Sequence, residues 1–476
     1  MTVKLTKVVL LLPAAFPIPK FVTKKTTTVT VRQMRGVLST LKHSGVLPMK
    51  YHIIILIFMF LIFSCEDNNS ENDENSINDE NVVDVDIPDE ENYLDFSAET
   101  VELNEKTVRD TIFCAGMLVI CGESDGKAYL AGFNDGKEKW RIFLDDQSVQ
   151  SINVLTCGNT ETSDYFLFAG GDRSKGTESP QTGFIMSFQP ETGALIDTIE
   201  IDNGTAVSVY ALTTDSEMNI FAGGRVEGNF EGSEESGGKD GFIVKYSHKG
   251  EKLFLTQFGT PEFDSVQGLV IGSDGYLLAS GYSGGDIATG MAANDSDDMK
   301  GFVIKFKPDG LPHWKKMYDA THFWKISAPV PYSFFVAGSM KKEGKSVAVT
   351  YQIGLDGKIK SIYSFPAQGN SVATGIDSDD EKNIYITGYI EGDFVNGGKI
   401  PPVGSDLPAK NNIFLGIFNT TTAKLLYGTL FGTESHDINP KIAVEDSSTL
   451  HISFYSVEEL TDSSGKATVT IFEKVE

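Results

Sequence analysis

Histidine and acidic side chains are the groups of this 476-residue chain that could hold a metal or move protons. Five histidines follow residue 65: His248, His313, His322, His436 and His451. None belongs to an H-E-x-x-H motif, which would place two zinc-binding imidazoles on one face of a helix. His322 and His436 fall in equivalent connections of the repeat described below. The histidine spacing therefore predicts surface side chains and no metal site.

Two acidic turns offer oxygen ligands. Asp295–Asp298 and Asp377–Asp380 both read Asp-Ser-Asp-Asp. Such turns can bind Ca²⁺, but neither has the ligand spacing and glycine of an EF-hand loop. Asp side chains more often cap their own turn. We therefore expect no cofactor, with Ca²⁺ at one of these turns as the alternative.

Covalent chemistry has little support in the sequence, because no Ser/His/Asp set is evident. Cys114, Cys121 and Cys157 all lie inside apolar segments typical of strands. Three is an odd number, so at least one thiol stays free within a monomer. We expect these cysteines to be small buried hydrophobic residues and not a redox site. The chain is expected not to be an enzyme.

The charge distribution excludes one class of partner. The net charge is −26, yet the first 64 residues contain nine Lys or Arg and no Asp or Glu, which leaves −35 for the remainder. Such an acidic surface repels phosphate backbones, so nucleic-acid binding is not expected.

The N-terminal segment resembles a bacterial lipoprotein leader. In residues 49–64 a Met-Lys pair precedes an apolar run from Ile53 to Phe63, which suits a signal peptide and is short for a membrane span. "LIFSC" resembles a lipobox, and this resemblance implies lipidation of Cys65. A buried thiol is the alternative. Residues 1–48 then precede a complete signal, which indicates an over-extended start or a disordered segment; a true cytoplasmic extension is the other possibility.

Residues 65–95 are expected to form a disordered acidic tether. Twelve of the 27 residues from 66 to 92 are Asp or Glu, and none is Lys or Arg. Such a composition buries too little apolar surface to offset chain entropy. The tract also resembles the export signal of surface lipoproteins in Gram-negative bacteria. The expected location is the cell envelope, lipid-anchored at the outer membrane.

A strand–turn–strand pattern recurs through the rest of the chain. "KDGFIVKYSHKGEKLFLTQFG" begins at Lys239, and "MKGFVIKFKPDGLPHWKKMYD" begins at Met299. A turn ending in glycine between two alternating apolar segments is typical of a β-hairpin. A second hairpin precedes it, as in "SVYALTTDSEMNIFAGG", so the unit has four strands, a to d. Seven copies can be aligned.

Seven four-stranded units at this period predict a seven-bladed β-propeller of antiparallel blades, an all-β fold, over residues 96–476. One such sheet has two apolar faces, and radial stacking in a closed ring buries both. The seventh copy ends after strand c. We expect residues 93–105, "YLDFSAETVELNE", to supply its missing strand and close the ring; a frayed N-terminal segment is the alternative.

A glycine ends strand b in six copies. It allows either a close approach of two backbones or a positive φ where the chain leaves the strand. These glycines are at positions 122, 170, 223, 281, 338 and 388.

The third, fourth and sixth copies resemble the propeller repeats known as SBBP repeats. "DSDDEKNIYITGYIEGDFVNGG" and the hairpin at Lys239 are similar to the N-I-Y-V-T-G core, the D-x-F-V-x-K strand and the D-G turn of that family. The resemblance weakens in copies one, five and seven. It implies the propeller fold and no shared activity. "DGKEKWRIF" around Trp140 also resembles the tryptophan-docking repeat of quinoprotein propellers, but three tryptophans cannot dock seven blades.

Loop lengths select one face of the predicted propeller. The c–d turns are tight, whereas long insertions join strands b and c at residues 171–182, 225–240, 282–300 and 389–410. All four must lie on one rim, and loops on a rigid scaffold commonly carry binding sites. Tolerated insertions without a function are the alternative. The candidate ligand-binding residues on these loops are Arg173, Phe230, Tyr282, Asp286, Tyr389 and Phe394.

The sequence therefore favours a monomeric, non-catalytic binding or scaffold module for a protein or glycan, attached to the membrane through its N-terminal lipid. A polysaccharide-active hydrolase or lyase is one alternative, which would need convergent carboxylates and aromatic sugar platforms. A purely structural adhesion component is the other.

Overall fold

The computed structural model describes residues 2–4, 28–30, 82–84, 94–103, 105–144, 149–160, 162–174, 180–233, 236–292, 299–365, 367–392, 394, 410–421, 425–460 and 465–475. The chain divides into two units, residues 1–72 and 73–476. In the first unit, β1 (Thr2–Lys4) pairs antiparallel with β2 (Thr28–Thr30). The predicted signal peptide, Cys65 and most of the predicted tether lie outside the described residues.

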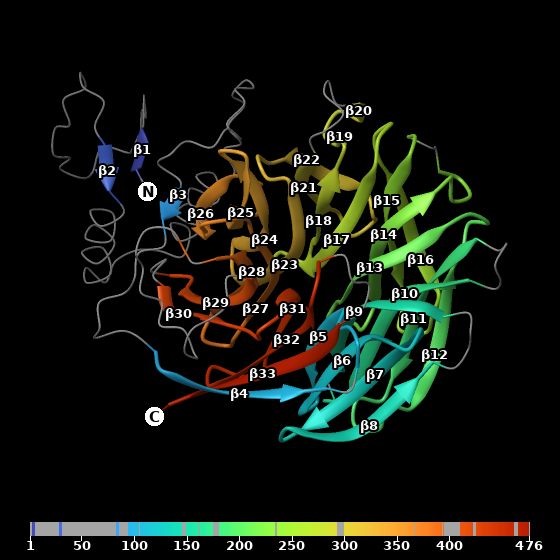
Figure 1. Cartoon of the computed structure of the whole chain (residues 1–476). Coiled ribbons are helices and arrows are strands. Elements are labelled where there is room, and N and C mark those ends of the chain that lie inside the picture. Colours follow the sequence, from blue (N-terminus) through green and yellow to red (C-terminus); the bar gives the residue numbers. More distant parts are fainter. Residues whose placement is uncertain are drawn as a thin grey trace, which may run out of the picture. The chain divides into compact units, whose positions relative to one another are not determined.

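In the described part of the second unit, seven blades follow one another in chain order, each built on four antiparallel strands (Figure 1). Blade 1 comprises β5 (Asp110–Cys114), β6 (Met117–Ser124), β7 (Lys127–Asn134) and β8 (Lys137–Phe143). Blade 2 comprises β9 (Val149–Asn159), β10 (Tyr165–Ser174), β11 (Gln181–Phe188) and β12 (Leu195–Ile201). Blade 3 comprises β13 (Val207–Thr214), β14 (Ile220–Glu227), β15 (Lys239–Tyr246) and β16 (Lys252–Phe258).

The remaining blades repeat this order. Blade 4 comprises β17 (Asp264–Ile271), β18 (Leu277–Ser283), β21 (Lys300–Phe306) and β22 (Pro312–Met317), with a small hairpin of β19 (Gly285–Asp286) and β20 (Met291–Ala292) in its b–c loop. Blade 5 comprises β23 (His322–Val330), β24 (Ser333–Lys342), β25 (Lys345–Gly354) and β26 (Ile359–Phe365). Blade 6 comprises β27 (Ser371–Ser378), β28 (Asn383–Glu391), β29 (Asn411–Asn419) and β30 (Leu425–Phe431).

The seventh blade closes the ring with a strand from the other end of the propeller sequence. It comprises β31 (His436–Val444), β32 (Thr449–Val457), β33 (Lys466–Lys474) and β4 (Phe96–Glu102). β4 pairs antiparallel with β33, and the two lie side by side in Figure 1 as a cyan and a red strand. Each innermost strand packs against that of the next blade, and β31 packs against β5. The predicted seven blades and the predicted closure are both confirmed.

One short strand departs from the expected tether. β3 (Val82–Asp84) pairs in parallel with β26 and makes blade 5 five-stranded. Residues 82–84 are therefore a sheet edge, within a tract that the sequence predicts to be disordered throughout.

The innermost strands of blades 2 to 6 each contain an extra residue, relative to strand b, at one equivalent position. Opposite each of these β-bulges, a glycine lies so close that a Cβ would overlap a carbonyl oxygen of strand a. The extra residues are Asn153, Tyr210, Gln267, Trp324 and Thr374. The facing glycines are Gly171, Gly224, Gly281, Gly338 and Gly388.

The close backbone approach predicted for the strand-b glycines is therefore confirmed. The alternative of a positive φ is wrong, because none of these glycines has one. The glycine that faces the bulge is Gly171 in blade 2 and Gly224 in blade 3. Each lies one residue beyond the predicted position. Gly122 of blade 1 approaches the carbonyl oxygen of Thr107 in the same way.

Aromatic side chains on the outermost strands join neighbouring blades. Trp140 on β8 donates its indole N–H to the carbonyl oxygen of Pro190 at 2.8 Å, in the c–d turn of blade 2. Trp314 on β22 donates to the carbonyl oxygen of Leu355 at 3.1 Å, in the corresponding turn of blade 5. Two of the three tryptophans therefore dock onto the next blade.

The cysteines differ from expectation in one respect. Cys114 on β5 and Cys157 on β9 form a disulfide that links blades 1 and 2. Cys121 is a free, buried thiol, as predicted. The packing of the innermost strands of adjacent blades brings Cys114 and Cys157 together although 43 residues separate them, and local sequence pattern does not reveal such a contact.

Candidate functional site

The strand register defines two faces of the propeller. The last residues of each strand b pair with the first residues of strand a, as Ser283 does with Asp264. The b–c loops and the d–a connections therefore share one face, which we call the loop face. The a–b and c–d turns form the opposite turn face. The described parts of two long connections, residues 228–233 with 236–238 and residues 284–292 with 299, lie on the loop face as predicted.

Three of the six predicted ligand-binding residues are occupied by internal contacts. Arg173 forms an ion pair with Glu200 on β12. Phe230 is 5% exposed and packs edge-on against Phe242 at 5.4 Å, which makes it part of the core and unavailable to a partner. Phe394 packs against the core ring of Phe414 at 5.9 Å. The structure therefore gives these residues roles in anchoring loops.

Two further predicted residues lie at the rim. Asp286 on β19 caps the turn of its own small hairpin, because its carboxylate accepts hydrogen bonds from the Ala288 N–H at 2.9 Å and the Thr289 hydroxyl at 2.8 Å. Tyr389 is half-buried on β28, and burial raises the pKa of its hydroxyl. Neither residue belongs to the group of side chains that surrounds the sixth, Tyr282.

Tyr282 lies at the centre of a partly buried group that we call the aromatic–arginine cluster. Its ring stacks on Phe263 at 5.9 Å and meets the imidazole of His322 edge-on at 4.7 Å. His322 in turn stacks on Trp324, with 5.2 Å between ring centres. Burial lowers the pKa of His322, so its imidazole is neutral at pH 7. The full cluster is Tyr210, Arg225, Phe263, Tyr282, His322 and Trp324.

Arg225 adds a cation to this aromatic surface. Its guanidinium lies 5.2 Å from the ring centre of Tyr210 and 5.5 Å from that of Phe263. No carboxylate of the described residues forms an ion pair with it. Cation–π contacts therefore position the guanidinium and leave its planar set of N–H donors available for an anionic or carbonyl group.

Trp324 is placed by the β-bulge of blade 5. A bulge redirects the side chain of the extra residue, and here that residue carries an indole. The Trp324 Nε1 atom is buried, and no described residue accepts its hydrogen bond. An unpaired buried N–H costs about 1–3 kcal/mol, so an acceptor supplied by a ligand would be favoured.

Sequence reasoning found Tyr282 and missed its neighbours. Arg225 is the first residue of the predicted insertion 225–240, but the structure places it on β14, and it was not among the six candidates. Trp324 lies on β23, outside the predicted long loops. A usable signal was the constant interval of the bulge residues, because Asn153, Tyr210, Gln267 and Trp324 are spaced 57 residues apart.

One serine could be mistaken for a nucleophile. Residues Gly281–Gly285 read G-Y-S-G-G, the spacing of a nucleophile elbow. Ser283 is fully buried, and its hydroxyl donates to the carbonyl oxygen of Gly285 at 3.0 Å. β19 follows it where an elbow would lead into a helix. The local structure is therefore that of a tight loop.

Charged side chains also meet at the propeller axis. Lys325 on β23 approaches Asp110 on β5, and Lys441 on β31 is close enough to both for their charges to affect its pKa. Burial lowers the pKa of Lys441 to about 8. Burial also raises the pKa of Asp377 to about 6. The hydrogen bonds that its carboxylate accepts from the Val444 and Ser378 N–H groups lower the pKa and so oppose this rise.

Within the described ranges, no group of three or more His, Cys, Asp or Glu side chains is arranged to hold a metal. Asp379 of the predicted acidic turn caps its own turn, with its carboxylate accepting from the Asn383 N–H at 2.8 Å and the Tyr385 hydroxyl at 2.8 Å. The other acidic turn, Asp295–Asp298, lies outside the described residues. His322 and His436 both lie on the loop face, but on blades 5 and 7.

The described residues also include no helix that is long and apolar enough to span a membrane.

The comparisons with known proteins support the fold alone. No protein-family model matches the sequence, and no curated protein is similar to it. The structure is similar to the crystal structure of Raptor from Chaetomium thermophilum, with a TM-score of 0.51, 8% identity and coverage of 81% of this chain. This chain spans 29% of the length of that one. The WD40 domain of Toxoplasma gondii coronin is matched over 83% of this chain and 89% of its own, with 10% identity and a TM-score of 0.48.

Proposed function

We propose that the chain is an envelope lipoprotein whose propeller is a non-catalytic binding or scaffold module, with a protein or glycan partner held on the loop face. The propeller fold fits such a module. The aromatic–arginine cluster is the observation that carries the proposal, because it joins partly exposed rings to a guanidinium without a carboxylate partner.

The chemistry of the cluster suits recognition. Trp, Tyr and Arg are the residues that most often dominate binding energy at interfaces. Flat aromatic faces stack on sugar rings and on other apolar surfaces, while the guanidinium binds carboxylates or carbonyl oxygens through parallel hydrogen bonds. Five of the six side chains come from strands of blades 3, 4 and 5, and Phe263 directly precedes β17, so the cluster is held by a rigid scaffold.

A glycan array and an envelope pull-down with the purified chain test this function. Tyr282→Ala and Trp324→Ala should each weaken binding by about thirtyfold, since truncating an interface aromatic costs about 2 kcal/mol. Tyr332→Ala is the matched control, because Tyr332 is 76% exposed and lies in an a–b turn on the opposite face. Equal binding by all three variants would contradict the proposed site, and turnover of a polysaccharide would favour the hydrolase or lyase alternative.

The anchor has an independent test. Radiolabelled palmitate should enter the protein in cells and should be absent from Cys65→Ala. Equal labelling of both proteins would refute lipidation at Cys65 while leaving the propeller's binding function open to the first experiment.

A further inference from the structure

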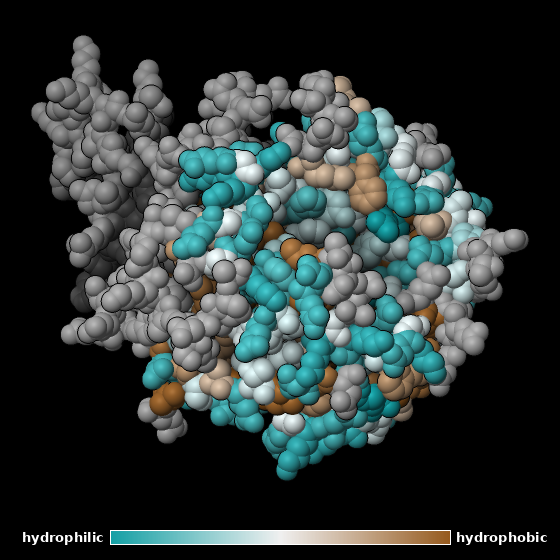
Figure 2. Space-filling model, in the orientation of Figure 1, coloured by the Kyte–Doolittle hydropathy of each residue, from teal (hydrophilic) through white to brown (hydrophobic). Residues whose placement is uncertain are grey.

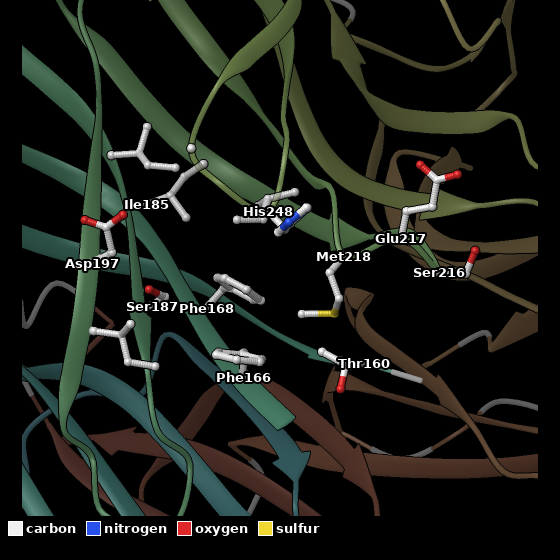
Figure 3. A pocket seen from close by; sticks show the side chains of 14 residues that line it. Thr160, Phe166, Phe168, Ile185, Ser187, Asp197, Ser216, Glu217, Met218 and His248 are labelled. Carbon is white, nitrogen blue, oxygen red and sulfur yellow. The ribbon is translucent and has the colours of Figure 1, made fainter. Parts of the chain in front are cut away.

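A pocket opens on the turn face between blades 2 and 3, away from the aromatic–arginine cluster. Its volume is about 490 Å³, and its apolar floor includes Phe166, Phe168 and Met218. Figure 3 shows Asp197 and Glu217 on opposite sides of the two phenylalanine rings. Among the coloured residues in the view of Figure 2, the hydrophobic areas shown in brown are small and separate. The pocket combines an apolar floor with an acidic rim.

The outermost strand of blade 2 lacks an aromatic side chain that four other blades carry at the same position. The outermost strand d of blades 1 to 6 contains a β-bulge, and the residue of strand d that follows its extra residue marks an equivalent position in each blade. That position holds Trp140 in blade 1, Phe254 in blade 3, Trp314 in blade 4 and Tyr427 in blade 6. In blade 2 it holds Asp197, which is exposed. Blade 5 has Ser361 there, and Tyr363 packs on Phe418 of blade 6 instead.

The aromatic side chains at this position cover the c–d turn of the next blade. A Cβ placed on Gly193 would come within 2.6 Å of the Trp140 ring. Over Gly250, the equivalent turn glycine of blade 3, the nearest atom is a methyl of Ile199 at 3.8 Å. No ring of the described chain therefore lies over Gly250 as Trp140 lies over Gly193.

We infer that this pocket receives an aromatic side chain, best a tryptophan, from a partner polypeptide with a basic residue beside it. Trp140 shows the hydrogen bond expected, because its indole donates to Pro190, the second residue after β11. His248 is the second residue after β15, so its carbonyl is in the corresponding place.

The acidic rim argues for a flanking Lys or Arg. Asp197 and Glu217 form no ion pair with any lysine or arginine that the structure describes. Leu195 and Ile196, which are 55% and 48% exposed, extend the apolar surface along the edge strand β12. A segment of chain covers this larger area and pairs its cations with the rim, whereas free indole would leave both carboxylates uncompensated.

The peptide acetyl-Lys-Trp-Lys-amide is a direct probe, with acetyl-Lys-Ala-Lys-amide as its control. Titration of the protein carrying ¹³C-methyl methionine should shift the Met218 methyl signal with the Trp peptide only, because the indole ring would lie over it. Equal shifts with both peptides, or no shift, would overturn the inference.

A variant that fills the pocket provides the second test. Asp197→Trp gives blade 2 the residue type found in blades 1 and 4, and should weaken binding of the Trp peptide at least tenfold. Ser361→Trp introduces the same side chain at the same strand position of blade 5 and should leave binding unchanged. Undiminished binding by Asp197→Trp would overturn the inference. If that variant misfolds, the Met218 signal in the unmodified protein still decides.

Discussion

Lys325 and Asp110 form an ion pair across the axis of the propeller, with Lys325 Nζ 3.0 Å from Asp110 Oδ2, although they belong to blades 5 and 1. The same carboxylate oxygen accepts a hydrogen bond from the Leu155 N–H of blade 2 at 2.9 Å. Asp110 is only 2% exposed. One buried carboxylate therefore ties together three blades, two of which are not neighbours in the ring.

Removing the lysine of this pair should be costly. Lys325→Met leaves a buried carboxylate without its cation, and we expect the free energy of unfolding to fall by about 3 kcal/mol. The double variant Asp110→Asn/Lys325→Met should recover much of that loss, because no charge is then left unpaired. Urea denaturation of the two single variants and the double variant measures the coupling. Lys252→Met, at an exposed site, is the control, and an equal loss there would contradict the prediction.

The disulfide should contribute measurably to stability. Closing a 43-residue loop between Cys114 and Cys157 restricts the unfolded chain, which corresponds to about 4 kcal/mol in the chain-entropy model. Reductant should therefore lower the urea midpoint, and Cys114→Ser/Cys157→Ser should show the lower midpoint without reductant. Among these three cysteines, only Cys121 should react with a thiol reagent in denaturant alone. A midpoint that is insensitive to reductant would show that the bridge adds nothing.

Two adjacent glycines should differ sharply in their tolerance of a methyl group. A Cβ at Gly224 would overlap the backbone oxygen of Ser208, whereas one at Gly223 meets a methyl of Val266 at 2.9 Å, and side chains can move. Gly224→Ala should therefore lower the free energy of unfolding by at least about 3 kcal/mol, and Gly223→Ala by less. Thermal and urea unfolding of the two variants compares them, and the reverse order would argue against a backbone approach fixed by the bulge.

Asp264 should make stability depend on pH. Burial is the main cause that raises its pKa to about 6, and Asp240 adds to the rise, while hydrogen bonds from Ser283 and Thr260 oppose it. The folded protein then binds more protons than the unfolded chain between about pH 4 and 6, so this group's contribution falls as the pH rises through that window.

Lowering the pH from 7 to 5 should gain about 1.4 kcal/mol from Asp264 alone, at 1.36 kcal/mol per pH unit. Asp377 titrates in the same range, so the measurement is the difference between the parent protein and Asp264→Asn, which both retain Asp377. The asparagine can still accept the Thr260 N–H. A pH profile unchanged by the substitution would contradict the assignment.

The sequence predicts the architecture because each blade is a local pattern repeated seven times. Hairpins such as that at Lys239 need only alternating apolar residues and a turn glycine, and the missing strand d of the last copy predicts β4. The tight c–d turns and long b–c insertions likewise follow from counting residues, so the loop face could be located.

The candidate sites depend on relationships that a single pass along the chain does not reveal. Phe230 is aromatic and lies in a long loop, yet it packs into the core, because loop position says nothing about burial. Arg225 of blade 3 and Trp324 of blade 5 belong to one cluster only because Phe263 and Tyr282 lie between them. Asp197 occupies a position that holds an aromatic side chain in four other blades. This difference is visible only once the registers of strands c and d are aligned.

The pairing of β4 with β33 also determines when the molecule can be completed. The ribosome makes residues 96–102 near the start of the propeller and residues 466–474 at its end. The first six blades can assemble in order during translation, but the outer edge of β33 does not exist until these blades have been made. Residues 96–102 therefore lack their strand partner while about 360 intervening residues are synthesised, and the ring can close only after residues 466–474 emerge.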